Sequence, residues 1–381
     1  MALFKCIYGL KQASRRWFEK LRGILTNAGY KSTTSDPCLY VRQRKGEYTL
    51  ISVVVDDLLI ASNLEAKADR VIGELRKAGL ETKDLGFPEF TIGMHIARNK
   101  VGDIEISQKL YLETILNRFG MGKCNSVDTP ADPNVKLGTA HQPKTAKEKV
   151  AMESRPYRSL VGALLYMTLT RPDISVAVNE CCRYVSCPGA AMWTAGKRIL
   201  RYLKRTAHYT LKLSATGDDA ETDLKCFVDA SHADDSDTRR SRCGWVIMHG
   251  GNLVAWKTTL QKRVALSTAE AEYRAATLAT KVVVWMRRLL GEVGFPQTSP
   301  TPMYEDNEAC VKMVENPIVS KRNKHIELDC HYIRQEYKLG SIRMVRVGTT
   351  DQRADLMTKN LPRPAFVRHT CALMSTDSMP P

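Results

Sequence analysis

The stretch LKCFVD, residues 224–229, has the pattern of an apolar strand that ends in a carboxylate, and the fold of the last third of the chain is deduced from it. Three further carboxylates follow in comparable positions. Asp306 also ends a short apolar run, Glu272 lies on a predicted helix, and Asp355 lies near the start of the last predicted helix. Because an unpaired buried charge is costly, these acids predict one shared binding site rather than solvated surface.

A site that gathers carboxylates is normally a metal site, and a site made only of oxygen ligands favours magnesium or manganese. Two divalent ions about 3.5–4 Å apart can activate a water and stabilise a leaving oxygen in phosphodiester hydrolysis. Asp229 and Asp306 each end a strand that should lie centrally in a sheet, so they should meet at one edge. The pattern therefore indicates phosphoryl-transfer chemistry on a polyanion.

The motif STAEAEY, residues 267–273, offers two glutamates, and helical periodicity chooses between them. Glu272 lies at the edge of an apolar stripe, and Glu270 lies roughly on the opposite face. We therefore expect Glu272 to face the strand ends. Glu270 should lie in water, where it favours the helix dipole. The stripe consists of Ala275, Ala279, Val282, Met286 and Leu289.

The last domain is predicted to be a mixed α/β sheet with flanking helices. Its strands are expected at 224–228, 242–248, 253–256, 302–305 and 342–347, and its helices at 267–290, 308–314, 326–339 and 350–358.

Earlier in the chain, a β-branched strand at 51–55 is followed by Asp56, Asp57 and a second apolar run at 58–61. This pattern predicts a tight hairpin that exposes two carboxylates at its turn. Helices are also expected at 64–79, 108–119, 157–169, 174–184 and 192–205, and paired strands at 90–97 and 103–107.

Composition supports a nucleic-acid partner. The 381 residues carry 57 Lys and Arg against 41 Asp and Glu, a net charge of +16. A surface this basic is more typical of a protein that binds nucleic acid than of an enzyme that acts on small molecules. The alternative explanation of the charge is that it only keeps the protein soluble. The 11 cysteines are odd in number and show no repeated spacing. No signal peptide is recognised at the start of the sequence. The longest apolar run, 160–169, is too short to cross a bilayer. We expect reduced thiols, no membrane partner, and a cytoplasmic or nuclear protein.

Several strings together resemble one family in order and spacing. Those of the last third resemble the ribonuclease H domain of copia-type retrotransposon Pol polyproteins, and earlier ones resemble the palm of its reverse transcriptase and the segment between the two enzymes. The ribonuclease H strings are FVDASHAD (227–234), SRCGW (241–245), AWK (255–257), ALSTAEAEY (265–273), EDN (305–307), KHIE (324–327) and ADLMTK (354–359). The earlier strings are IYGLKQA (7–13), VDD (55–57), DLG (84–86), YRSLVG (157–162) and TRPDI (170–174).

The resemblance implies a ribonuclease H-type endonuclease that cleaves the RNA strand of RNA–DNA hybrids with two Mg²⁺ ions, Mn²⁺ being a substitute. The implied catalytic residues and metal ligands are Asp229, Glu272, Asp306 and Asp355. The expected nucleic-acid-binding residues are Arg239, Arg240, Arg242, Lys257, Lys262, Arg263, Lys321, Arg322 and Lys324.

The expected fold class is α/β and α+β: a partial reverse-transcriptase palm and a helical connection, followed by a ribonuclease H-like mixed sheet. The expected parts are a truncated palm and thumb remnant (1–125), a linker (126–156), a helical connection segment (157–215), a ribonuclease H-like domain that folds alone (216–368) and a disordered tail (369–381).

The palm-like part departs from the family pattern. The polymerase of the family needs a third carboxylate from an upstream strand. Val54 stands where the family has tyrosine, and Ser14 stands where the family usually has proline. We expect Asp56 and Asp57 to be polymerase remnants without DNA synthesis by this chain alone. Three hypotheses stay open: a working ribonuclease H, a catalytically silent basic nucleic-acid-binding remnant, or a polyprotein piece that acts with the missing polymerase segment or other Pol parts.

Overall fold

The computed structural model describes residues 9–44, 46–64, 66–100, 102–214, 223–316 and 328–376. The chain forms two compact units, one of residues 1–88 and 284–298 and the other of residues 89–283 and 299–381. The helices are α1 (Ala13–Asn27), α2 (Ala66–Lys77), α3 (Lys109–Arg118), α4 (Ala146–Glu153), α5 (Tyr157–Met167), α6 (Ser175–Cys182), α7 (Ala190–Arg205), α8 (Thr268–Glu292), α9 (Glu308–Glu315), α10 (Leu328–Lys338) and α11 (Arg363–Leu373), with short 3₁₀ segments η1 (Thr139–His141), η2 (Pro172–Ile174), η5 (Thr349–Asp351) and η6 (Arg353–Met357). The strands are β1 (Lys31–Ser32), β2 (Leu39–Arg44), β3 (Glu47–Val54), β4 (Asp57–Ser62), β5 (Phe90–Thr91), β6 (Met94–Arg98), β7 (Ile104–Ser107), β8 (Leu211–Leu213), β9 (Leu224–Ser231), β10 (Arg242–His249), β11 (Asn252–Leu260), β12 (Thr301–Glu305) and β13 (Ile342–Arg346).

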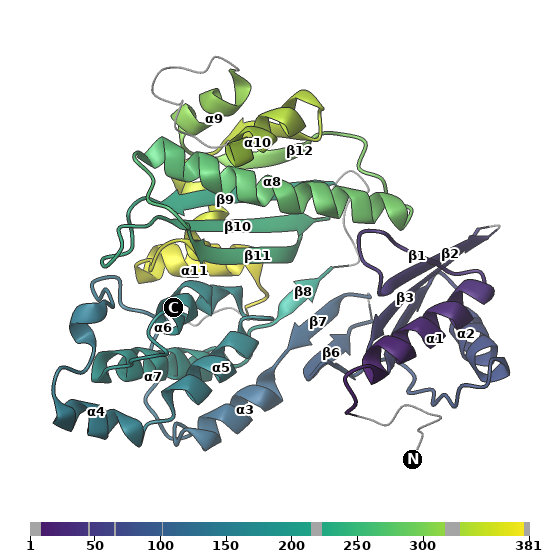
Figure 1. The fold of residues 1–381 in the computed structure, drawn as a ribbon, viewed down its shortest axis with the longest axis horizontal. Coiled ribbons are helices and arrows are strands. Elements are labelled where there is room, and N and C mark those ends of the chain that lie inside the picture. The colour runs from purple at the N-terminus through teal and green to yellow at the C-terminus, as the bar shows by residue number, and fades with distance from the viewer. Residues whose placement is uncertain are drawn as a thin grey trace. The chain divides into compact units, whose positions relative to one another are not determined.

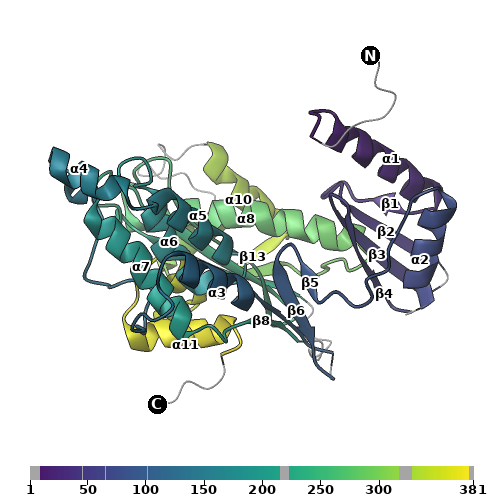
Figure 2. The same cartoon turned by 90° about the horizontal axis from the view of Figure 1, so that it is seen from below.

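The first unit is an antiparallel sheet in the order β1-β2-β3-β4 with α1 and α2 (Figure 2). Tyr40 of β2 and Ile51 of β3 are cross-strand partners, so their side chains share one face of the sheet. Leu25 of α1 and Val71 of α2 pack with them in one apolar cluster. The burial of this face against both helices holds the predicted 51–61 hairpin in place.

The second unit contains, within the described residues, a five-stranded sheet in the order β11-β10-β9-β12-β13. The strands β9, β10 and β11 form an antiparallel meander, and β12 and β13 then add in parallel. This mixed sheet with flanking helices confirms the ribonuclease H-like fold class expected from the sequence. The parallel pair requires crossover connections, which α8 and the segment with α9 and α10 supply.

The two faces of this sheet have different covers. Gln261 donates from its side-chain amide to the carbonyl of Ala271 at 2.9 Å and contacts Cys243 Sγ, which places α8 over the Cys243 face (Figure 1). Gly244, the next residue, points to the other face, where it meets Met357 of η6. The chain thus brings η6 and α8 to opposite sides of β10.

The face beneath η6 belongs to an apolar core that extends well beyond the sheet. Phe227 and Val246 of the sheet pack in one cluster with Leu112 of α3, Leu164 of α5 and Leu200 of α7. We call this cluster the shared core. It joins the predicted connection segment to the predicted ribonuclease H-like domain, so the expected boundary at residue 216 crosses one continuous apolar interior.

The expected boundaries at 125, 156 and 216 all lie inside the second compact unit. They stay predictions about domain organisation. The expected disordered tail is wrong for residues 369–376. Residues 369–373 continue α11, with His369 and Leu373 buried, and Ser375 pairs with Thr210. A short helix without a strong apolar period gives little sequence signal, and tertiary packing forms it here. Residues 377–381 lie outside the described residues.

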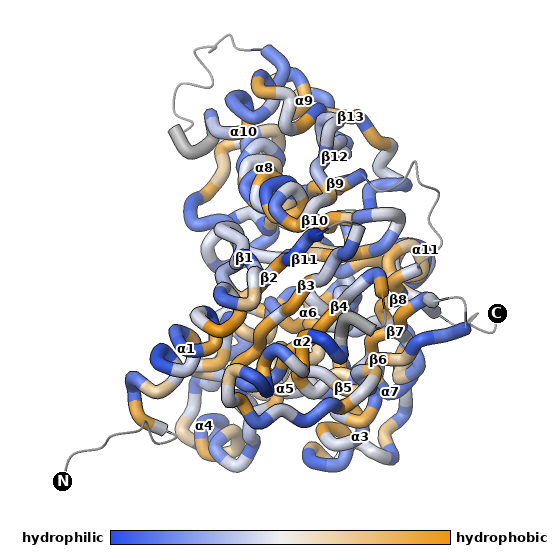
Figure 3. The backbone as a smooth tube through the Cα atoms, turned by 90° about the vertical axis from the view of Figure 1, so that its right-hand side faces the viewer, coloured by the Kyte–Doolittle hydropathy of each residue, from blue (hydrophilic) through white to orange (hydrophobic). Residues whose placement is uncertain are grey.

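Hydropathy along the chain is mixed, and hydrophobic stretches fall on strands such as β3 and β10 (Figure 3). None of the described helices is both long and apolar enough to cross a membrane.

Candidate metal and catalytic site

Asp229 and Asp306 are brought together by parallel strand register. Tyr304 of β12 lies opposite Phe227 of β9, and each aspartate follows its partner residue by two positions. Asp229 lies within β9 rather than after it, since the strand continues to Ser231. Asp229 is 1% exposed, and Asp306 is half-buried immediately beyond β12.

Glu272 joins these two aspartates from the second turn of α8. It is 3% exposed, and its Oε2 atom has no hydrogen-bond partner among the described residues. Carboxylate oxygens of Asp229, Glu272 and Asp306 all lie within 4.8 Å of one another. Three separate elements therefore converge on one small volume, as the sequence predicted for these three residues.

Asp355 lies on η6, and two features seat this segment against the sheet. A Cβ atom at Gly244 would lie 2.6 Å from side-chain atoms of Met357 and Thr358, so glycine permits the close approach. The Gln352 side chain donates to the carbonyl of Val228 at 2.9 Å and accepts from Ala354 N at the start of η6. Gly244 and Gln352 thus fix the distance between η6 and the sheet strand β9.

Asp355 does not belong to the close cluster of three carboxylates, but one cation connects it to Asp229. Lys359 Nζ lies 2.7 Å from Asp355 Oδ1 and 3.3 Å from Asp229 Oδ2. Thr358 also donates a hydrogen bond from its hydroxyl to Asp229. The fourth predicted residue is therefore adjacent to the first, with an ammonium group between them.

Burial dominates the electrostatics of the cluster. Burial, followed by the neighbouring charges of Glu305 and Asp229, raises the pKa of Glu272 to about 11. Burial also raises the pKa of Asp229, against the opposing effect of Lys359, and burial followed by Asp229 raises the pKa of Asp306. Carboxyl groups with raised pKa values in one place are groups that a nearby divalent cation would return to their charged form.

The residues present fit a divalent cation. The donors are all carboxylate oxygens, which Mg²⁺ and Mn²⁺ prefer. The Glu272 carboxylate lies in the cluster, and its Oε2 atom has no hydrogen-bond partner among the described residues. Asp229, Glu272 and Asp306 could hold one ion, and Asp229 with Asp355 could contribute to a second.

The expectation that Glu270 lies in water is wrong. Glu270 is 2% exposed, accepts a hydrogen bond from Leu266 N at 2.9 Å, and pairs with Arg274 at 2.7 Å. The carboxylate caps the helix start and meets a cation one turn later, so it can be buried at little cost. The helical stripe placed Glu272 correctly but gave no information on the loop that covers Glu270.

Two residues near the site were not singled out by sequence. Glu305 is fully buried, its Oε2 atom has no hydrogen-bond partner in the described part of the chain, and burial raises its pKa well above the usual range. Strand alternation carries a signal, because Thr301, Met303 and Glu305 share one buried face of β12. Lys359 could have been found from its spacing of four residues after Asp355.

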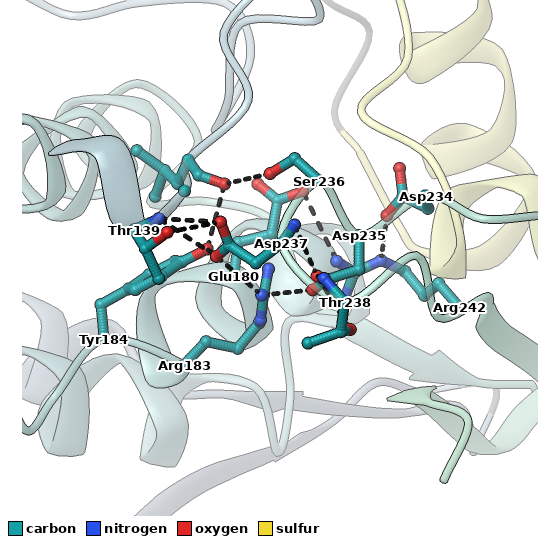
Figure 4. A network of polar contacts seen from close by, with 12 residues as sticks. Thr139, Glu180, Arg183, Tyr184, Asp234, Asp235, Ser236, Asp237, Thr238 and Arg242 are labelled. Carbon is teal, nitrogen blue, oxygen red and sulfur yellow. Dashed lines mark hydrogen bonds and ion pairs between the residues drawn. The ribbon is translucent and has the colours of Figure 1, made fainter. Parts of the chain in front are cut away.

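Arg242 was predicted to contact nucleic acid, and this prediction is wrong. The side chain is 1% exposed. Its Nε donates to Asp234 Oδ2 at 3.0 Å, its Nη1 donates to Asn179 Oδ1 at 2.6 Å, and Glu180 lies 3.6 Å away (Figure 4). A guanidinium with these partners is a structural link between β10 and α6.

The loop before β10 is tied down by a related network (Figure 4). Arg183 pairs with Asp235 and with Asp237, and Tyr184 donates to Asp237 at 2.9 Å. Thr139 donates to Asp237 from its backbone and its hydroxyl. These contacts fix the loop that carries the exposed Arg239 and Arg240.

The other basic candidates divide into two groups. Those that lie exposed are Arg239, Arg240, Lys257, Lys262 and Arg263. Those that lie outside the described residues are Lys321, Arg322 and Lys324.

The expected hairpin is present in the first unit. Asp56 lies in the turn and Asp57 begins β4, and both are exposed. Val55 has a positive φ of 56°, and its carbonyl accepts a hydrogen bond from Trp17 Nε1 at 2.8 Å. Among the described residues, the grouping of three or more potential metal ligands found is the one at Asp229, and it does not include this pair.

Comparison with known proteins gives matches along nearly the whole chain. The family described as reverse transcriptase (RNA-dependent DNA polymerase) matches residues 1–133. The retrovirus-related Pol polyprotein from transposon TNT 1-94 of Nicotiana tabacum is 36% identical over 367 residues, which are 96% of this chain and 27% of that protein. The transposon Ty5-1 protein of Saccharomyces cerevisiae is 31% identical over 277 residues, 72% of this chain and 87% of that protein.

A solved structure of RNase H1 from the halophilic archaeon Halobacterium salinarum NRC-1 covers 35% of this chain and 93% of its own, with 17% identity and a TM-score of 0.26. The chain spans about a quarter of the length of the Pol polyproteins from Nicotiana tabacum and Arabidopsis thaliana that it matches, 27% of the first and 24% of each of the others. By its similarity along nearly its whole length, the chain belongs to the copia-type retrotransposon Pol polyprotein family.

Proposed function

We propose that this chain is a retrotransposon-derived ribonuclease H that hydrolyses the RNA strand of RNA–DNA hybrids. The observation that carries the proposal is the convergence of Asp229, Glu272 and Asp306, from β9, α8 and the end of β12, within 4.8 Å. Asp355 is the fourth proposed ligand. The two magnesium ions, for which manganese would substitute, would supply an activated water and a stabilised leaving oxygen when bound.

The side chains around the carboxylates have positioning roles in this proposal. Thr358 orients Asp229 through its hydroxyl, and Gln352 holds η6 against β9. Glu305 lies close to Glu272, and loss of its proton when cations bind would add negative charge that favours the occupation of the site. Burial of the carboxylates excludes water that would otherwise screen these interactions.

The proposed substrate follows from charge and from family membership. Exposed Arg239, Arg240, Lys257 and Lys262 would contact phosphates and supply a salt-sensitive share of the affinity. The 2′-hydroxyl of RNA is the group by which such a site would distinguish a hybrid from duplex DNA. The proposed partner is therefore an RNA–DNA hybrid.

The test is cleavage of a labelled RNA–DNA hybrid by the purified 381-residue chain with Mg²⁺, with the same RNA as a single strand for comparison. We expect cleavage of the hybrid only, and none with EDTA. Equal cleavage of single-stranded RNA, or of neither substrate, would overturn the proposal.

A second candidate is that the chain acts as part of a longer reverse transcriptase. The observation that favours it is that the chain spans about a quarter of the Pol polyproteins it matches. Asp56 and Asp57 would then need a carboxylate from an upstream polymerase segment or another Pol part. Primer extension that requires this segment in trans would support this candidate. The cytoplasmic or nuclear location stays a prediction.

A further inference from the structure

Lys359 lies between the first and the last of the four proposed metal ligands. Its Nζ atom is 2.7 Å from Asp355 Oδ1, 3.3 Å from Asp229 Oδ2 and 3.4 Å from Asp229 Oδ1. Both aspartate side chains are less than a tenth exposed, whereas the lysine side chain is 37% exposed. The ammonium group therefore approaches the carboxylates from the solvent side.

Among the described residues, the other side of the cluster has no such cation. No ion pair within 4.0 Å joins Glu272 or Asp306 to a basic side chain in the described part of the chain, and the Oε2 atom of Glu272 has no hydrogen-bond partner there. The four carboxylates are thus unequal. Asp229 faces acceptors on one side and an ammonium on the other.

We infer that Lys359 is a built-in competitor for the second divalent ion. This inference rests on the proposed function. The first ion binds at Asp229, Glu272 and Asp306, and the second binds between Asp229 and Asp355 only after the Lys359 ammonium has moved away. Lys359 is a positioning residue that sets the order and the concentration dependence of metal binding.

Distance and charge support this competition. A magnesium ion lies about 2.0–2.1 Å from its oxygen ligands, and the ammonium already contacts oxygens of both Asp229 and Asp355. Two cations that use the same oxygens repel each other strongly in a buried setting. Lysine can leave because its four-carbon stem is flexible and its side chain is partly exposed, so the charged group reaches water without disturbing η6.

Retention of the ammonium when the site lacks its ions is also favourable. Lys359 offsets the repulsion between Asp229 and Asp355, because its ammonium group contacts oxygens of both carboxylates. The same residue can therefore stabilise the metal-free chain and oppose the second ion.

The experiment is a titration of the full chain with Mn²⁺, followed by isothermal calorimetry and by the spin-resonance signal of free Mn²⁺. The variants are Lys359→Met, Lys359→Arg and, as a matched control on the exposed end of α10, Lys338→Met. We expect Lys359→Met to bind the second ion about ten-fold more tightly, equivalent to about 1.4 kcal/mol, with the first ion unchanged. Lys359→Arg and Lys338→Met should resemble the original chain, and circular dichroism should show that each variant is folded.

Unchanged or weaker binding of the second ion by Lys359→Met, with the first ion still bound, would overturn the inference and leave the proposed function intact. Failure of the original chain to bind any ion, or tight binding of the first ion that survives Glu272→Gln, would instead overturn both.

Discussion

Glu270 and Glu272 lie two residues apart near the start of α8 and are both buried, but their surroundings differ. Arg274 pairs with Glu270, whereas the Oε2 atom of Glu272 has no hydrogen-bond partner among the described residues. Paired and unpaired buried carboxylates have different physical roles. This contrast separates a residue that holds the helix from one that is available to a cation.

Glu272→Gln should lower hybrid cleavage by more than about 100-fold, since even the loss of a second-shell partner costs 10–100-fold. Glu270→Gln should leave cleavage nearly intact and lower the free energy of unfolding by about 1.5–3 kcal/mol, because it weakens a charged hydrogen bond. Rates on a labelled hybrid and thermal unfolding separate the two effects. An inactive Glu270→Gln variant of normal stability would contradict these roles.

The stability of the metal-free chain should depend on pH through Glu272. The pKa of this group is about 11 in the folded chain and about 4.3 when unfolded. The folded state therefore binds more protons, and the contribution of Glu272 to stability is lost progressively as the pH rises from about 4.3 towards 11. In EDTA, the free energy of unfolding of Glu272→Gln minus that of the original chain should therefore increase between pH 5.5 and 8, by at most about 1.4 kcal/mol per pH unit. Urea unfolding at several pH values measures this difference, and a difference that stays constant with pH would refute the prediction.

Arg242 and Arg240 should behave differently when each is replaced by methionine. Arg242→Met leaves Asp234 and Glu180 without their buried cation and should cost about 3–5 kcal/mol of stability. Arg240→Met should change the free energy of unfolding by no more than about 0.5 kcal/mol. It should reduce the slope of the logarithm of the binding constant against the logarithm of salt concentration by about one, which corresponds to the loss of one phosphate contact. Binding isotherms at several salt concentrations, with thermal unfolding, make the comparison. A stable Arg242→Met variant with weakened binding would restore the original prediction for Arg242.

The purified chain should not extend a primer on an RNA template with Mg²⁺ or Mn²⁺. Asp56 and Asp57 are exposed at a hairpin turn, and the acidic cluster found among the described residues does not include them. Two carboxylates without a third do not assemble a two-metal polymerase site. Extension that disappears in Asp56→Asn would show that a third ligand comes from elsewhere in the chain.

A fragment of residues 216–381 should be less soluble and less stable than a fragment of residues 89–381. The shorter fragment would expose Phe227, Val246 and Met248, which pack in the shared core with helices before residue 216. Near-ultraviolet circular dichroism and light scattering of both fragments provide the test. Equal stability would support the domain boundary predicted from sequence.

The sequence determined most strands and helices of the last third of the chain, and it singled out the four candidate carboxylates. Period-two and period-3.6 patterns placed the strands around 224–260 and the long helix, because each must bury one face. The parallel pairing of β9 and β12, with Tyr304 opposite Phe227, brings Asp229 to Asp306. The family strings named the same four carboxylates.

Tertiary structure decided what local pattern cannot encode. Arg240 and Arg242 have the same predicted role in nucleic-acid binding, yet Arg242 is buried between Asp234 and Asn179 and Arg240 is exposed. Glu270 is buried by a loop, and Lys359 reaches Asp229 only because Gly244 lets η6 approach the sheet. The physical reason is that the surroundings of a charged side chain depend on residues distant in sequence, whereas strand and helix patterns depend on near neighbours.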